Sequence, residues 1–199
     1  NDQEMYNLQD DKRIDSLAEK IGFVYRIVEK KISNIEKFLS IVTNEKFILF
    51  DYESKTILYE EKIDLGIGFD NPAKVKFILE DKYLLVAGTR FLKLFDVDSK
   101  KFLYHIIDFE FGARSIEFVE SRNLILLGSW DGRILGFDLH SGEKNKIWGG
   151  HKGLIYSIAA NNDKSLFISG DSEGYLYFWD GISKNLLHFY KIHNSTITT

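Results

Sequence analysis

The feature that most constrains the fold is a short pattern that recurs at a nearly constant interval. An aromatic residue followed by aspartate occurs in four places, 45, 42 and 42 residues apart: Phe50-Asp51, Phe95-Asp96, Phe137-Asp138 and Trp179-Asp180. A serine follows each aromatic residue four positions later, at Ser54, Ser99, Ser141 and Ser183. Self-similarity at a period of roughly 20 to 50 residues indicates one structural unit repeated along the chain. The sequence therefore predicts four copies of the same unit.

Each unit contains four short segments rich in β-branched and aromatic residues, which is the composition of β-strands. In the third unit these segments are "RSIEFV", "LILLGS", "RILGFDL" and "NKIWGG". In the fourth they are "IYSIAA", "LFISGD", "YLYFWD" and "NLLHFYK". The dipeptides Asp131-Gly132 and Glu173-Gly174 occupy the same place in these two units and are typical of hairpin turns. Four-stranded units at this period indicate the blades of a β-propeller.

The fourth unit resembles a WD repeat over its whole length. It begins with Gly150-His151, has "SG" at the end of its second strand, and closes with Trp179-Asp180. The resemblance implies an all-β propeller of WD-repeat type with about four four-stranded blades, forming a partial ring. It also implies a structural tetrad, which is a buried network of polar side chains. The four positions that match the tetrad are His151, Ser169, Glu173 and Trp179.

The repeat divides the chain into successive parts. Residues 1–22 form an extension in which apolar residues recur at the spacing of a short amphipathic helix. The blades are expected at about residues 23–63, 73–108, 113–150 and 151–192. His193 follows His151 by one period, so residues 193–199 are predicted to begin a fifth blade. Because closed WD propellers most often have about seven blades, we expect the rest of a longer chain, or a second copy, to complete the ring.

Some short patterns resemble catalytic or metal-binding motifs, but each is better explained as part of the repeat. The segment from Gly170 to Gly174 matches the G-x-S-x-G pattern of a hydrolase, with Ser172 as nucleophile. That motif requires a helix after the serine, whereas Ser172 precedes the strand-like "YLYFWD". The five histidines do not pair at metal-ligand spacings, and the chain has no cysteine. The sequence therefore predicts no catalytic residue, no metal site and no cofactor.

Composition narrows the class of partner. The net charge is −4, with Lys+Arg 26 against Asp+Glu 30, whereas nucleic-acid binders usually carry a basic surface. The polar start "NDQEMYNLQDDKR" does not resemble a signal peptide, and the longest apolar runs have the length of strands. We therefore expect a cytoplasmic or nuclear protein with protein partners, and we expect neither nucleic acid nor membranes as partners.

Partners of similar propellers often dock on the loop face near the central channel. The residue before the turn acid and the early positions of each first strand lie on that face. Trp130 is the leading candidate because tryptophan is over-represented among interface hot spots; the alternative is that Trp130 packs on a neighbouring blade. The complete set of candidate positions is Trp130, Ser172, Gly112, Arg114, Leu154 and Tyr156.

Together these patterns predict a non-enzymatic scaffold that presents loop residues to a protein partner within a larger protein or complex. Two other classes remain open. One is an enzyme or cofactor-binding propeller that uses its central channel, which would need carboxylates or histidines in register on the channel-lining strands. The other is an adaptor associated with chromatin or RNA, whose binding would depend steeply on salt.

Overall fold

The computed structural model describes residues 27–33, 37–43, 46–63, 74–106, 112–161 and 166–198. Within these ranges the chain forms sixteen β-strands in four four-stranded antiparallel sheets. The first two sheets contain β1 (Ile27–Ile32), β2 (Phe38–Thr43), β3 (Lys46–Asp51), β4 (Thr56–Lys62), β5 (Lys74–Ile78), β6 (Tyr83–Ala87), β7 (Leu92–Asp96) and β8 (Lys101–Ile106). The last two contain β9 (Ala113–Val119), β10 (Leu124–Ser129), β11 (Arg133–Asp138), β12 (Lys144–Gly149), β13 (Ile155–Asn161), β14 (Leu166–Asp171), β15 (Tyr175–Asp180) and β16 (Leu186–Lys191). A short 3-10 helix (Glu120–Arg122) joins β9 to β10.

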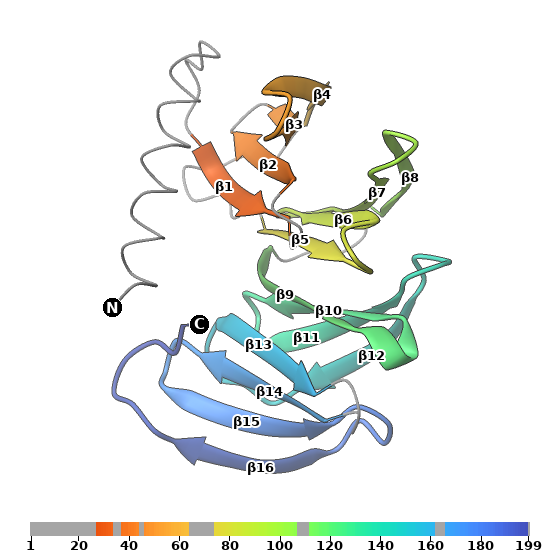
Figure 1. Cartoon of the computed structure of the whole chain (residues 1–199). Coiled ribbons are helices and arrows are strands. Elements are labelled where there is room, and N and C mark those ends of the chain that lie inside the picture. Colours follow the sequence, from red (N-terminus) through yellow and green to blue (C-terminus); the bar gives the residue numbers. More distant parts are fainter. Residues whose placement is uncertain are drawn as a thin grey trace.

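The four sheets follow one another as the blades of a partial propeller, numbered 1 to 4 along the chain (Figure 1). In each blade the strands pair in sequence order, and the first strands β1, β5, β9 and β13 contact one another in succession. The predicted fold class, an all-β WD-type propeller of four four-stranded blades, is thereby confirmed. The short helix predicted in residues 1–22 lies outside the described residues.

The recurring aspartate caps the turn between the third and fourth strands of each blade. Its Oδ1 accepts a hydrogen bond from the backbone N–H of the recurring serine, at 2.8, 2.7, 2.9 and 3.1 Å in blades 1 to 4. Backbone N–H donors in the turn favour the ionised carboxyl and are the main reason why its pKa lies below the usual value in all four copies. The pattern that repeats in the sequence is therefore a turn cap.

The hydrophobic core consists of three clusters, each between two neighbouring blades. The aromatic residue before each recurring aspartate is almost completely buried, and three of the four belong to these clusters: Phe95, Phe137 and Trp179. Face-to-face burial of apolar side chains is the dominant favourable term in folding. Blades 1 to 3, which carry less of the WD signature, are thus held by packing against their neighbours.

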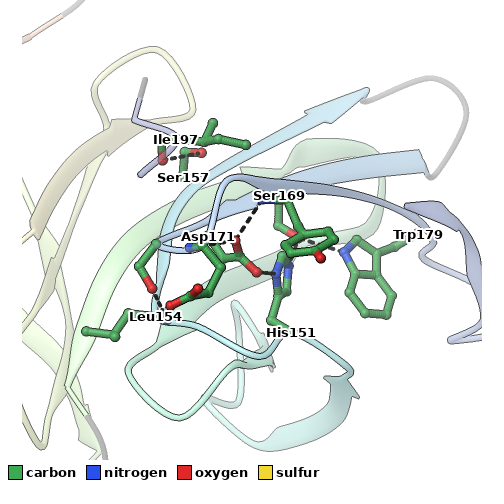
Figure 2. A network of polar contacts seen from close by, with 10 residues as sticks. His151, Leu154, Ser157, Ser169, Asp171, Trp179 and Ile197 are labelled. Atoms are coloured by element: carbon green, nitrogen blue, oxygen red, sulfur yellow. Dashed lines mark hydrogen bonds and ion pairs between the residues drawn. The ribbon is translucent and has the colours of Figure 1, made fainter. Parts of the chain in front are cut away.

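The segment after β16 contacts blade 4 in the way that β13 contacts blade 3. The Ser115 hydroxyl in β9 donates to the Ile155 carbonyl at 3.3 Å. In the next blade, the Ser157 hydroxyl donates to the Ile197 carbonyl at 3.5 Å (Figure 2). Each isoleucine also lies against a glycine in the second strand of the blade that it contacts. Residues 193–198 thus repeat, one period later, the packing of a first strand on the blade before it.

Candidate functional site

A chain of hydrogen bonds joins four buried side chains in blade 4 (Figure 2). The Trp179 Nε1 donates to the Ser169 Oγ at 2.7 Å. The same Oγ lies 2.6 Å from the Nε2 of His151, whose Nδ1 lies 2.9 Å from the Asp171 Oδ2. The Asp171 carboxylate can only accept, so the imidazole proton is on Nδ1 and is donated to Oδ2. In the neutral imidazole Nε2 is then an acceptor, and the Ser169 hydroxyl donates to it.

The carboxylate of this network is Asp171 rather than the predicted Glu173. Asp171 is fully buried at the end of β14, and its Oδ1 also accepts the backbone N–H groups of Glu173 and Tyr175. Alternate residues of a strand point to the same face, so Asp171 shares the face of Ser169. Glu173 lies beyond the strand in the turn, and its side chain is exposed. The predicted His151, Ser169 and Trp179 do lie together.

Burial keeps His151 neutral. Its side chain is 0% exposed, and its ring centroid lies 3.7 Å from that of Tyr177. Desolvation lowers the pKa of His151 below its ordinary value, and the adjacent Asp171 offsets this only in part. A neutral imidazole is consistent with this network, in which Nδ1 donates to Asp171 and Nε2 accepts from Ser169. These bonds tie the segment before β13 to β14 and β15, so the network stabilises the blade.

Ser172 serves the same blade as a turn residue. Its backbone N–H donates to the Leu154 carbonyl at 2.9 Å, and its Oγ accepts the Leu154 N–H at 3.1 Å. The strand β15 follows the turn, where a nucleophile elbow would have a helix. Two of the predicted partner-binding residues, Leu154 and Ser172, therefore form a backbone contact that positions the loop before β13.

Three other predicted partner-binding residues lie together at the junction of blades 3 and 4. The Arg114 Cζ lies 4.8 Å from the ring centroid of Trp130 and 5.3 Å from that of Tyr156. Arg114 is the second residue of β9 and Tyr156 the second of β13, which are contacting strands, and Trp130 begins the turn after β10. We call this group the Trp130–Arg114–Tyr156 stack. It spans two blades, and its three side chains are partly exposed.

A glycine permits the close packing of the indole. A Cβ added at Gly112 would lie 3.1 Å from Cε2 of Trp130, which is closer than most real Cβ contacts. The Trp130 ring therefore lies over the backbone just before β9, on its own blade, and reaches blade 4 through Arg114 and Tyr156. The contacts of the indole are with its own blade and with Arg114, and the role of Trp130 as a partner-binding residue stays a prediction.

The stack contains polar groups without partners. The Nε of Arg114 and the Nε1 of Trp130 are buried and have no hydrogen-bond partner among the described residues. The carboxylate of Asp131, which follows Trp130 in the chain, is paired with Arg133. The described part of the chain thus leaves the positive charge of Arg114 unpaired at the surface of a rigid junction.

In the ranges that the structure describes, no group of three or more histidine, aspartate or glutamate side chains is arranged to hold a metal ion. Nor does that part of the chain include a helix long and apolar enough to cross a membrane.

Comparison with known proteins agrees with the blade architecture. Residues 142–180, which contain the network of blade 4, match the family model described as WD domain, G-beta repeat. A protein of Acanthamoeba polyphaga mimivirus, whose description names a BTB/POZ domain and WD repeats, is 29% identical over 87 residues. That alignment covers 43% of this chain and 17% of the viral protein. Together with the four blades, these similarities show that the chain contains WD-type repeats, which generally serve as protein-interaction scaffolds.

Proposed function

We propose that the chain is a non-enzymatic scaffold that docks a protein partner on the Trp130–Arg114–Tyr156 stack. The observation that carries the proposal is the stack itself, because it gathers tryptophan, arginine and tyrosine at one junction. Tryptophan, tyrosine and arginine are enriched among hot spots, where buried area is gained at little entropic cost. The stack stands on paired strands of two packed blades, so little further ordering is needed on docking.

The environment of His151 supports a scaffold over an enzyme. This histidine is enclosed by Ser169 and Asp171, and both of its ring nitrogens are occupied. A general base must lie within hydrogen-bond reach of a substrate proton. Both ring nitrogens of His151 are hydrogen-bonded and its side chain is buried, so it cannot reach the proton of a substrate. The tight network around it serves the rigidity of blade 4.

The packing of Ile197 supports a further proposal on organisation. We propose that residues 193–198 belong to the first strand of another blade, because Ile197 contacts Ser157 as Ile155 contacts Ser115. A ring extended in this direction would keep the stack on the same face, at the junction of blades 3 and 4. The stack would then remain available to a partner.

The variant Trp130→Ala tests the docking surface. The immobilised chain would be exposed to an extract of the cells that make it, and captured proteins would be quantified by mass spectrometry. We expect the variant to lose specific partners at least tenfold, as truncation of an interface hot spot does. Its thermal midpoint should change little, because the ring is partly exposed and its N–H bonds to no described residue.

Tyr190→Ala is the matched control, since Tyr190 is an aromatic residue of β16 that is 56% exposed. It should capture the same proteins as the wild type. If Trp130→Ala retained every partner, the assignment of the docking surface would be wrong. A fall in the thermal midpoint of more than about 10 °C, as expected for loss of a core side chain, would show instead that Trp130 is part of the core.

A further inference from the structure

We infer that the Trp130–Arg114–Tyr156 stack binds a carboxylate from an acidic segment of the partner, and that Arg114 is the residue that receives it. This inference rests on the proposed function and names the chemistry of the partner at that surface. It goes beyond a general hot spot, because it assigns a charge and a hydrogen-bonding geometry to the group that docks.

The charge of Arg114 is the first argument. The structure pairs other cations of the blades with acids: Lys76 with Glu117 at 2.8 Å, and Lys93 with Glu61 at 3.0 Å. Arg114 makes no ion pair or hydrogen bond within the described residues, although a guanidinium is always ionised and offers five N–H donors. An unpaired guanidinium beside two aromatic rings is suited to bind an anion.

The orientation of the guanidinium is the second argument. A guanidinium that packs on aromatic faces presents its N–H groups along its edge, where two parallel hydrogen bonds to a carboxylate can form. The Nε of Arg114 has no hydrogen-bond partner, so folding leaves this edge donor for a carboxylate oxygen. Contacts with two aromatic rings restrict the movement of the group before binding, which lowers the entropic cost of a bidentate contact.

The two buried N–H groups are the third argument. The Nε of Arg114 and the Nε1 of Trp130 lack acceptors among the described residues, and buried donors without acceptors are costly. A carboxylate brings only acceptors. Because the Nε of Arg114 is buried, a small side-chain rearrangement, of the kind that is common when interfaces form, would bring it to the second oxygen. Binding would then satisfy donors that folding leaves unpaired.

Carboxylates fit this surface better than the phosphates of a nucleic acid do. The chain has a net charge of −4, and the side chain of Glu173 is exposed in a turn of blade 4. A nucleic acid would carry a long row of phosphates past these charges, whereas a short acidic segment needs only one of its carboxylates at Arg114, with the methylene or apolar groups of its neighbours beside it. The aromatic rings on either side provide contacts for those neighbours.

The test follows the indole N–H resonances of the three tryptophans during titration with acetylated hexaglutamate. Hexaglutamine and inorganic phosphate, at matched ionic strength, are the comparison probes. Hexaglutamate should shift the Trp130 resonance in a saturable way. Trp148 and Trp179 are internal controls, because their indoles are buried and already donate to the Asp180 carbonyl and to Ser169. Hexaglutamine should cause no shift.

Arg114→Gln should weaken hexaglutamate binding at least tenfold. Arg114→Lys should weaken it to a smaller extent, because lysine keeps the positive charge but lacks the paired N–H groups of the guanidinium. Arg90→Gln, which removes an equal charge from an exposed side chain in blade 2, should bind within twofold of the wild type. Matching thermal midpoints would show that these variants fold. If Arg114→Gln bound hexaglutamate as the wild type does, or if phosphate bound as tightly as hexaglutamate, the carboxylate assignment would be overturned.

Capture experiments separate this inference from the proposed function. If partners that depend on Trp130 still bound Arg114→Gln and resisted displacement by hexaglutamate, the docking surface would stand and the carboxylate inference would fail. If hexaglutamate bound at Arg114 but no captured protein depended on Trp130, the site for an acidic group would stand and the proposed scaffold role of the stack would fail.

Discussion

Replacing His151 with alanine removes the central member of the network in blade 4. The Asp171 Oδ2 loses its imidazole donor while its side chain remains fully buried, and the hydroxyl of Ser169 loses its acceptor. The contact of the imidazole with the Tyr177 ring is lost as well. The variant therefore leaves polar groups unpaired in an interior that water does not reach, which is costlier than the loss of a hydrogen bond at the surface.

The magnitude follows from these losses. Each buried polar group left without a partner costs about 1–3 kcal/mol, so an unpaired acceptor and an unpaired donor together cost about 2–6 kcal/mol, and we expect about 3 kcal/mol because the penalty at the acid is limited. Protonation of Asp171 would limit the penalty, because a buried carboxyl without a donor can become neutral. For a chain of this size, 1 kcal/mol shifts the thermal midpoint by about 2–4 °C. We expect His151→Ala to lower the midpoint by about 6–12 °C.

Urea unfolding followed by circular dichroism, with a thermal scan in parallel, measures the effect. His140→Ala is the matched control, because His140 has an exposed side chain in a turn of blade 3 and should alter the free energy of unfolding by less than about 0.5 kcal/mol. Equal midpoints for His151→Ala and His140→Ala would refute the argument, since they would show that the network contributes nothing to the stability of blade 4.

Two further predictions concern the same network. Asp171→Asn should lower the free energy of unfolding by about 1–3 kcal/mol, whereas Glu173→Gln, on an exposed side chain, should change it by less than about 0.5 kcal/mol; equal losses would restore Glu173 as the acid of the tetrad. Because the pKa of His151 is lowered in the folded chain, the unfolded chain binds the proton more readily. Stability should be complete above about pH 6.5 and should fall as the pH drops through the lowered pKa. Urea midpoints measured from about pH 5 to 8 should depend less on pH in His151→Ala than in the wild type. If the pH dependence were the same in both, it would arise from other groups, such as His105, whose pKa is also lowered by burial.

Much of the fold could be predicted from the sequence because its signals are local. The cap on each turn joins an aspartate to a serine only three residues away, so Asp138 and Ser141 mark the end of a third strand in any context. Strand composition between those marks then predicted four strands per blade. The match of residues 142–180 to a WD domain reflects the same local pattern in its most complete copy.

The identity of the buried acid could not be obtained by counting residues. Glu173 is the position that the resemblance assigned to the acid, but only Asp171 combines a position at the end of β14 with the face that Ser169 shares. The signal that could have revealed it was the alternation of side chains along a strand, since residues two apart share a face. The face of the strand toward which a side chain points identified the acid better than its spacing from Trp179 did.

The sequence by itself determined the repeat and the four strands of each blade, because those features depend on neighbours a few positions apart. Only the tertiary structure decided that Arg114 lies beside both Trp130 and Tyr156. Arg114 and Tyr156 are one full repeat apart, and their contact exists because β9 and β13 lie against each other. Whether Arg114 forms an ion pair depends on the direction in which the neighbouring acidic side chains point. That direction is determined only when the blades pack against each other.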